Sequence, residues 1–428
     1  MHDPRALLDP ATNSVQKLAR RGYQLDLDLL GKMSAERTAA AQAVDALRTQ
    51  TKSLAEQVRR APSAAERDGL VARARDVKSA LSEAEARQRR CDEELRDLLL
   101  TIPNLPDDAA PDGASDADAQ EIRRVGSIPA FDFAPQDHVS LGERTGILDL
   151  KRATKLAGAR FAVLSGAGAA LERALTTFFL TMHTTRHGYV EHSVPVLVNR
   201  ATMTGTGQLP KFEEDLFSTS VADRELFLVP TAEVPLTNLF AGETIATESL
   251  PLALTACTPC FRSEAGSYGK DTRGLIRLHQ FSKVELVRIC EPARAGAELE
   301  AMVRHAEACL AELGLAYRVV VLPAGDLGFA AQYTYDIEVW LPGQNSYREV
   351  SSCSNMGTLQ ARRANIRTRS RDGARGFAAT LNGSALPIGR TLAAILEQFQ
   401  QADGSIRIPD ALTALTGFTH IRPDGTTT

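Results

Sequence analysis

Apolar residues recur every three or four positions in two long stretches near the start of the chain. They lie at Ala40, Val44, Leu47, Leu54 and Val58 in the first stretch, and at Leu70, Ala74, Val77, Leu81, Ala84, Cys91, Leu95 and Leu98 in the second. Alternating steps of four and three are typical of a coiled-coil seam. Pro62, between the stretches, cannot occupy a helix interior without losing a hydrogen bond. The pattern predicts an antiparallel coiled-coil arm over about residues 32–100, with helices about 45 Å long.

Short runs of β-branched and aromatic residues alternate with helical patterns in the remainder of the chain. Strands are expected at residues 161–164, 225–229, 283–288, 317–322 and 335–340, and helices at residues 169–185, 293–313 and 391–400. Closely spaced strands favour a largely antiparallel sheet flanked by helices, so the expected fold class is α+β. Residues 101–123, rich in proline and aspartate, are expected to form a linker of turns.

Composition and charge narrow the possible classes of protein. The 428 residues include 49 Lys and Arg against 53 Asp and Glu, a net charge of −4, which excludes a histone-like basic protein. We do not expect DNA as a partner. Hydrophobic residues make up 43% of the chain, which is too many for a mainly disordered protein.

Cysteine usage and the absence of targeting patterns bear on the compartment. Six cysteines in this length do not form a disulfide scaffold. Cys257 and Cys260 make a lone CxxC pair without a second ligand pair at useful spacing, so no zinc site is expected. No apolar run approaches the ~20 residues of a membrane helix, and no signal segment follows Met1. We expect a soluble cytoplasmic protein without a membrane partner.

The strongest chemical signal is a glycine-rich basic loop between two apolar strands at residues 260–281. Arg262 and Glu264, two apart on a strand, are expected to share a face, as are Arg277 and Phe281. A guanidinium beside a carboxylate suits a ligand with anionic and amino groups, and a second cation with a ring would suit phosphates and a base. The alternative is a salt-bridged surface hairpin, which explains so many glycines and charges poorly.

Several segments together resemble the seryl-tRNA synthetases, a family of class II aminoacyl-tRNA synthetases. Residues 187–195 resemble class II motif 1, residues 260–281 resemble motif 2, and residues 381–391 resemble motif 3. The seryl family is matched by TAE at residues 231–233, GTGQLPKF at residues 205–212 and REVSSCSN at residues 348–355. The resemblance covers nearly the whole chain. It implies a tRNA-binding domain with a coiled-coil arm at residues 1–110 and a class II catalytic core at residues 111–428.

The resemblance also implies binding residues. The implied serine site comprises Thr231, Ala232, Glu233, Arg262, Glu285, Asn382 and Ser384. The implied ATP site comprises Arg262, Ser263, Glu264, Arg277, Phe281, Glu349, Val350, Ser351, Ser352 and Arg390. Thr231 and Glu233 would hold the α-amino group of serine, and Arg262 would bridge the serine carboxylate and the α-phosphate. Glu349 and Ser352 would ligate Mg²⁺, which prefers oxygen donors.

The implied reaction has two steps. The serine carboxylate attacks the α-phosphorus of ATP, and a ribose hydroxyl at the 3′ end of tRNA(Ser), or of tRNA(Sec), then takes the seryl group. Glu264 would bind the adenine amino group and Phe281 would stack under the ring, while Arg277 and Arg390 would hold the outer phosphates. Glu285, together with Ser384 and Asn382, would read the serine hydroxyl, whose absence in alanine would leave those partners unpaired.

The distal half of the predicted arm is basic. Between Arg48 and Arg75 there are seven basic and three acidic residues, a local charge of +4. This charge suits contacts with RNA phosphates, and the expected contact residues are Arg48, Lys52, Arg59, Arg60, Arg73 and Arg75. Without the resemblance, a solvated coiled-coil face is the simpler interpretation. In the family, the arm of one subunit holds tRNA for the other active site, so the resemblance implies a homodimer.

The chain departs from the family pattern at three places. Residues 356–359 (MGTL) replace an acidic–aromatic pair, Ala385 and Pro387 differ in motif 3, and residues 412–417 differ near the end of the chain. The departures raise a second hypothesis: a duplicate synthetase that resists a serine- or adenylate-mimicking antibiotic or supplies seryl-tRNA to a biosynthetic pathway. A third hypothesis is a non-catalytic RNA-binding relative, although such a relative should have lost its phosphate-binding arginines.

Overall fold

The computed structural model describes residues 1–265 and 273–428, so most of the glycine-rich loop predicted at residues 260–281 lies outside the described residues. The backbone packs into two compact units. The first comprises Met1–Ala19 and Tyr23–Pro103, and the second comprises Arg20–Gly22 and Asn104–Thr428. The sequence placed the domain boundary at residue 110, seven residues further along the chain. That the first unit binds tRNA stays a prediction.

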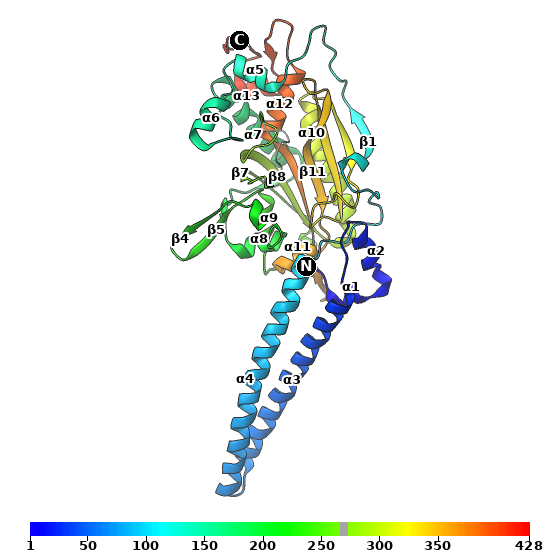
Figure 1. Cartoon of the computed structure of the whole chain (residues 1–428), viewed down its shortest axis with the longest axis vertical. Coiled ribbons are helices and arrows are strands. Elements are labelled where there is room, and N and C mark those ends of the chain that lie inside the picture. Colours follow the sequence, from blue (N-terminus) through cyan, green and yellow to red (C-terminus); the bar gives the residue numbers. More distant parts are fainter. Residues whose placement is uncertain (266–272) are drawn as a thin grey trace. The chain divides into compact units, whose positions relative to one another are not determined.

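The first unit is built on two long antiparallel helices. They are α3 (Leu27–Arg60) and α4 (Ala64–Thr101), and two short helices precede them, α1 (Pro4–Leu8) and α2 (Ser14–Ala19). Helices α3 and α4 lie side by side (Figure 1). Ala40, Val44 and Leu54 of the predicted seam are buried between them, and Ser63 caps the start of α4 by accepting a hydrogen bond from the Glu66 amide. The predicted coiled-coil arm is confirmed.

The second unit is built on an eight-stranded sheet. Its strand order is β1-β9-β10-β11-β14-β8-β7-β2, and every neighbouring pair is antiparallel except β2 and β7. The strands are β1 (Gln120–Val125), β2 (Val190–Glu191), β7 (Leu252–Phe261), β8 (Gln280–Cys290), β9 (Tyr317–Val321), β10 (Tyr333–Leu341), β11 (Ser346–Asn355) and β14 (Ala379–Pro387). The predicted antiparallel sheet is therefore confirmed.

Helices cover both faces of this sheet. On one face α7 (Ala167–Arg186), α10 (Ala295–Glu312) and α12 (Ile388–Gln398) pack against the central strands (Figure 1). Two short helices, α9 (Glu233–Asn238) and α11 (Leu359–Ala364), also contact β8 and β14, and Ala232, Leu236 and Ala361 are buried with strand residues in a separate apolar cluster. The short helices therefore bring their polar side chains close to the middle of the sheet.

The remaining elements surround this framework. The helices are α5 (His138–Arg144), α6 (Leu150–Ala157), α8 (Arg200–Thr206) and α13 (Asp410–Thr416). Three small sheets are formed by β3 (Leu197–Val198), β4 (Ser218–Val221) and β5 (Arg224–Leu228), by β6 (Thr244–Ala246), β12 (Arg367–Arg369) and β13 (Arg375–Phe377), and by β15 (Ile406–Arg407) and β16 (His420–Ile421). Among the described residues no helix is long and apolar enough to span a membrane.

Two sequence predictions of local structure were wrong. Residues 161–164 form no strand, and only an isolated bridge joins Leu148 to Leu164, because a run of four apolar residues does not distinguish a strand from a packed loop. The start of the expected linker at residues 101–123 is packed rather than open, while residues 114–118 are exposed as expected. Asn104 is buried and its amide donates to the carbonyls of Ala330 and Met356, both at 2.8 Å, while β1 begins at Gln120.

Candidate active site

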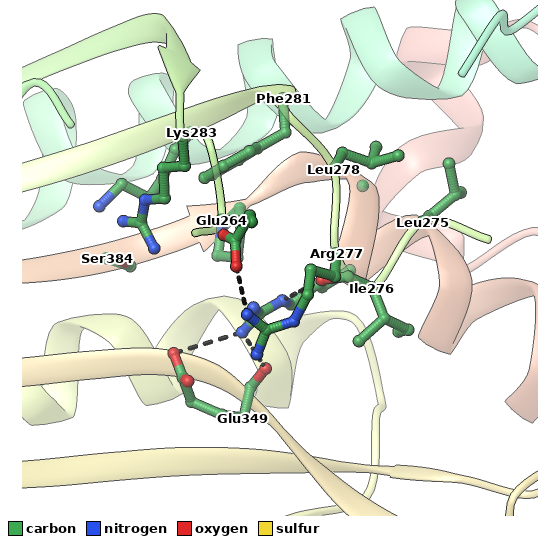
Figure 2. Close-up of a pocket in the computed structure, with 13 residues that line it drawn as sticks. Glu264, Leu275, Ile276, Arg277, Leu278, Phe281, Lys283, Glu349 and Ser384 are labelled. Atoms are coloured by element: carbon green, nitrogen blue, oxygen red, sulfur yellow. Dashed lines mark hydrogen bonds and ion pairs between the residues drawn. The ribbon is translucent and has the colours of Figure 1, made fainter. Parts of the chain in front are cut away.

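One cavity of the second unit gathers most of the residues that the sequence predicted to bind ATP. It lies where β8, β11, β14 and the first turn of α12 meet, and Figure 2 shows the side chains that line it. They are Arg262, Glu264, Leu275, Ile276, Arg277, Leu278, Phe281, Lys283, Glu349, Ser384, Pro387, Gly389 and Arg390. We call this space the arginine cavity.

Neither residue pair that was expected on one strand face lies together on a strand, since only Phe281 of the four residues belongs to a strand. β7 ends at Phe261, and Glu264 has a left-handed φ of 54°, so Arg262 and Glu264 do not share a strand face. β8 begins at Gln280, so Arg277 precedes the strand. The predicted convergence on one site holds, but the alternation of side chains along a strand is not its cause.

Two of the cavity's guanidinium groups are held by carboxylates. Arg277 forms an ion pair with Glu264, which Figure 2 marks as a dashed line. Arg390 Nη1 donates to the backbone oxygen of Glu349 at 2.8 Å and lies 3.3 Å from its carboxylate. Arg277 Nε is buried without a hydrogen-bond partner among the described residues. A buried donor in this state is costly, and a phosphate oxygen would satisfy it.

The third guanidinium belongs to Arg262. Its Nε donates to the carbonyl oxygen of Pro230 at 3.3 Å, and its guanidinium carbon lies 5.3 Å from the centre of the Phe281 ring. The ring and the backbone contact together orient the guanidinium plane. Three arginines that converge beside one aromatic ring suit an anionic ligand that also carries a flat ring system.

A β-bulge brings two oxygen donors onto one face of β11. Ile337 pairs with Ser351 and Glu338 pairs with Glu349, so the register shifts by one residue at Val350. Residues three apart on a regular strand point to opposite faces, but one extra residue restores the same face for Glu349 and Ser352. The sequence alone did not reveal this bulge.

The carboxylates around β11 are electrostatically coupled. Burial alone would raise the pKa of Glu349, but Arg390 and Arg262 outweigh it and hold that pKa below its usual value. Asp336, opposite Ser352 on β10, has a pKa raised well above its usual value by burial and by repulsion from Glu349. Glu349 is therefore the ionised member of this pair at neutral pH.

A second cavity of about 250 Å³ adjoins Glu233, Ser352 and Asn382, and we call it the glutamate cavity. Its other wall is apolar and includes Phe329 and Met356. Burial, followed by repulsion from the Glu285 carboxylate, raises the pKa of Glu233 to about 7. A buried carboxylate on one wall of a small cavity suits a compact cationic group such as an ammonium.

Thr231, Glu285 and Lys283 form a buried polar cluster beside these cavities. Thr231 Oγ1 donates to Glu285 Oε2 at 2.8 Å, and Lys283 forms an ion pair with the same oxygen. The Thr231 hydroxyl also accepts a hydrogen bond from the Glu233 amide at 3.2 Å. The predicted serine-site residues Thr231, Glu233 and Glu285 are thus brought together by direct contacts.

Six of the predicted site residues line neither cavity: Thr231 and Glu285 of the polar cluster, and the four residues Ala232, Val350, Ser351 and Ser263. Ala232 and Val350 are buried among apolar residues, Ser351 donates to the carbonyl oxygen of Ser384 at 2.6 Å, and Ser263 donates to the carbonyl oxygen of Glu214. Sequence reasoning missed Lys283, which lies two residues before Glu285 on β8. Its spacing of two residues from Glu285 on a predicted strand could have indicated that both side chains face the same side of the sheet.

The CxxC cysteines belong to the sheet. Cys257 and Cys260 both lie on β7, and because they are three residues apart their side chains face opposite sides of the strand. Burial raises the pKa of both thiols, that of Cys257 to about 11, so both are protonated at neutral pH.

Two sequence families match the chain. The family described as the seryl-tRNA synthetase N-terminal domain matches residues 1–106, and the one described as the tRNA synthetase class II core domain (G, H, P, S and T) matches residues 215–399. The serine–tRNA ligase 2 of Streptomyces avermitilis is 56% identical over all of both chains, and the serine–tRNA ligase of Syntrophotalea carbinolica is 49% identical over 97% of this chain and 98% of its own. The chain belongs to the seryl-tRNA synthetase family.

The fold agrees with this membership. The crystal structure of the seryl-tRNA synthetase from Pyrococcus horikoshii complexed with ATP superposes with a TM-score of 0.88 at 34% identity, covering 99% of this chain and all of that one. In this family member the class II motif 3 runs from β14 into α12 and places Arg390 in the arginine cavity. The motif-1 segment contains β2, an edge strand whose Val190 is 60% exposed.

Two of the three departures from the family pattern lie beside the cavities. Met356 lines this cavity, and Leu359 packs with Met356 and Phe329 in one apolar cluster. Ala385 and Pro387 lie on β14, where Ala385 is buried and Pro387 lines the arginine cavity. These two departures therefore border the cavities, and neither of them replaces a residue that was predicted to bind serine, ATP or Mg²⁺.

The basic residues predicted on the arm lie at its distal half. Arg48 pairs with Glu85 at 2.9 Å across the two helices, and Arg60 pairs with Glu56 one turn away. Arg59 and Arg75 line an apolar groove between α3 and α4. These placements leave several cationic groups on the surface of one segment of the first unit.

Proposed function

We propose that this synthetase activates L-serine with ATP to form seryl-adenylate and transfers the seryl group to tRNA(Ser), and also to tRNA(Sec). The observation that carries the proposal is the convergence of Arg262, Arg277 and Arg390 on one cavity beside Phe281. Such a site can neutralise a triphosphate and stack a purine, and the glutamate cavity next to it can hold a small amino acid. We assign the reaction to the cytoplasm.

In the first step, an oxygen of the serine carboxylate forms a bond to the α-phosphorus of ATP, and the bond between that phosphorus and the bridging oxygen breaks to release pyrophosphate. The carboxylate is already a nucleophile, so no protein base is needed. Arg262 would contact both the carboxylate and the α-phosphate, while Arg277 and Arg390 would hold the outer phosphates. Catalysis would come from positioning and from cations aimed at charge that develops on the phosphates.

Selection of serine would depend on buried polar partners for its hydroxyl. Thr231 and Lys283 both contact Oε2 of Glu285, and we propose Oε1 of the same carboxylate as the acceptor for the serine hydroxyl, with Ser384 nearby. Alanine would leave this buried acceptor without a donor. Sites of this kind reject the analogue that lacks the hydroxyl by about 10⁴-fold or more.

The donor set on β11 fits Mg²⁺. The β-bulge at Val350 puts the oxygens of Glu349 and Ser352 on one face, and Mg²⁺ is commonly held by one or two such ligands together with substrate phosphates. Mg²⁺ bound there would neutralise charge on the phosphates of ATP. The neighbouring Arg390 keeps Glu349 ionised, which a cation ligand requires.

Glu349→Gln is expected to raise the Mg²⁺ concentration needed for half-maximal pyrophosphate exchange by about tenfold or more, because the amide retains the shape but loses the charge. Titration of Mn²⁺ with the ATP-bound protein, followed by electron paramagnetic resonance, measures the same loss directly. Glu338→Gln is the matched control, since Glu338 pairs with Glu349 across the strands and contacts Arg318. Equal Mn²⁺ affinity in Glu349→Gln and wild type would contradict the assignment.

We propose a homodimer in which the arm of one subunit holds tRNA for the active site of the other, as the family arrangement implies. The edge strand β2 supports this assembly, because it pairs with β7 on one side only and its Val190 is exposed, which suits it to contact a second chain.

Amino-acid-dependent exchange of pyrophosphate into ATP tests the first step. Serine should support exchange, and alanine, glycine and threonine should not do so at equal concentration. The proposal would be contradicted if no amino acid supported exchange by the wild-type protein, or if alanine supported exchange as well as serine does.

A second candidate role is that of a duplicate synthetase with a specialised task. The relative at 56% identity is named serine–tRNA ligase 2, and the Met356 and Leu359 departures lie beside the glutamate cavity. Charging assays with and without a seryl-adenylate mimic, run beside a housekeeping seryl-tRNA synthetase, test this role. Tolerance of the mimic supports it, and equal inhibition of both enzymes contradicts it.

A further inference from the structure

Gln360 on α11 makes three hydrogen bonds beside the glutamate cavity. Its side-chain Nε2 donates to Glu233 Oε1 at 2.6 Å and to the carbonyl oxygen of Thr206 at 3.0 Å. Its Oε1 accepts a hydrogen bond from Thr380 Oγ1 at 2.6 Å. Gln360 is 1% exposed and Thr380 is fully buried, so water does not compete with these contacts.

These partners fix which end of the amide faces Glu233. Both hydrogens of the amide nitrogen are used, one by a carboxylate and one by a backbone carbonyl, and neither acceptor can donate. The Thr380 hydroxyl donates to the amide oxygen, which holds that oxygen away from Glu233. If the hydroxyl were absent, the amide could turn and present its oxygen to the carboxylate, where two acceptors would repel each other.

The charged groups around Glu233 explain why a fixed donor matters. Glu285 on β8 repels Glu233, while Lys283 on the same strand attracts it but is already paired with Glu285. The arginines on the other elements packed nearby are engaged with other groups. Arg363 on α11 donates to the carbonyl oxygens of Thr204 and Leu209. Arg200 on α8 pairs with Glu213 and Glu225, and Arg262, which follows β7, donates to the carbonyl oxygen of Pro230. Gln360 is therefore a neutral donor that favours the ionised form of Glu233, and its effect on the pKa is larger than that of the Asn382 side chain, which acts in the same direction.

We propose that Gln360, oriented by Thr380, is a positioning residue that holds the Glu233 carboxylate ready for the α-ammonium group of the amino-acid substrate. The proposal rests on the proposed function, since it assigns the ammonium of serine to the glutamate cavity. Neither Gln360 nor Thr380 contacts the reacting atoms, and both act through Glu233. Their loss should therefore weaken serine binding and leave the binding of ATP unchanged.

The dependence of serine binding on pH follows from the buried carboxylate. Because the pKa of Glu233 is raised to about 7, the carboxylate is protonated below that pH and loses its attraction for an ammonium group. The KM for serine in the pyrophosphate exchange assay is expected to rise about tenfold for each pH unit below 7. Above pH 7 the KM should level off until the serine amine itself loses its proton.

Thr380→Val and Gln360→Leu test the positioning role, with Thr380→Ser as the matched control that retains the hydroxyl. In both test variants the pH at which the serine KM begins to rise should shift upward by about one unit, since a hydrogen bond to the charged form is lost. At pH 7 this shift corresponds to a several-fold higher KM, with kcat and the KM for ATP unchanged. Thr380→Ser should reproduce the wild-type profile.

An unshifted profile in both Thr380→Val and Gln360→Leu would overturn the proposal, as would an equal shift in Thr380→Ser. If Gln360→Leu does not fold, Thr380→Val decides alone, because valine matches the shape of threonine. The failure of the proposed function is a separate result: in that case the wild-type chain itself would show no serine-dependent exchange.

Discussion

Arg262→Ala is expected to lower serine-dependent pyrophosphate exchange by about 10²–10³-fold, equivalent to about 3–4 kcal/mol of transition-state stabilisation. The guanidinium stacks on Phe281 and is tethered to the Pro230 carbonyl, so it is oriented before substrates bind. Its proposed partners, the serine carboxylate and the α-phosphate, are the two groups between which the new bond forms. The loss should therefore appear mainly in kcat, because the charge develops in the transition state.

Two variants make this result specific. Arg262→Lys keeps the positive charge but loses the planar fork, and should recover only part of the activity. Arg371→Ala removes an arginine that is 86% exposed and pairs with Glu248 on the surface, and it should behave like wild type. Near-normal exchange in Arg262→Ala, with an unchanged melting temperature, would contradict the role assigned to this residue.

Removal of residues 52–75 is expected to abolish the charging of tRNA while leaving pyrophosphate exchange intact. The deleted segment carries six basic and three acidic residues, a local charge of +3, and includes Arg59 and Arg75 beside the groove between α3 and α4. The Arg48–Glu85 and Arg37–Asp92 ion pairs are retained, so a short glycine linker can join the shortened helices. Aminoacylation and exchange, measured on the same preparation, separate the two steps.

A milder variant tests the electrostatic basis of the same prediction. The triple variant Arg59→Gln, Arg73→Gln, Arg75→Gln should raise the KM for tRNA at least about tenfold. It should also make the slope of log affinity against log salt concentration shallower by about 2, because fewer counterions are released from the RNA when fewer phosphates are contacted. Arg87→Gln, Arg89→Gln and Arg90→Gln combined make the same charge change nearer the base of α4. Parallel loss of exchange and charging in the deletion would show that the arm is needed for folding instead.

Local periodicity was enough to predict the arm and most of the sheet. The seam residues Ala40, Val44 and Leu54 are buried as their spacing indicated, and the break fell at Pro62, where a helix interior is unfavourable. Long elements such as β8 and α10 were recognised because many residues repeat one pattern. The five-residue strands β5 and β9 were also predicted, but the four residues 161–164 carry too few positions to separate a strand from a packed loop.

The geometry of the site depends on contacts that no local pattern records. Arg262 and Glu264 lie in a loop where Glu264 has a left-handed backbone conformation, and Glu349 and Ser352 share a face only because Val350 is bulged. Gln360 reaches Glu233 from a six-residue helix more than a hundred positions away in sequence. Family resemblance identified most of the charged residues of the site. The contacts of Lys283 with Glu285 and of Gln360 with Glu233 became visible only in the folded structure.

Aminoacylation of serine-accepting tRNA, with each of the twenty amino acids offered separately alongside ATP and Mg²⁺, is the decisive measurement of the proposed activity. We expect serine alone to be attached to the tRNA 3′ end, with the release of AMP and pyrophosphate. Attachment of a different amino acid, or formation of seryl-adenylate without transfer to any tRNA by the full-length chain, would contradict it.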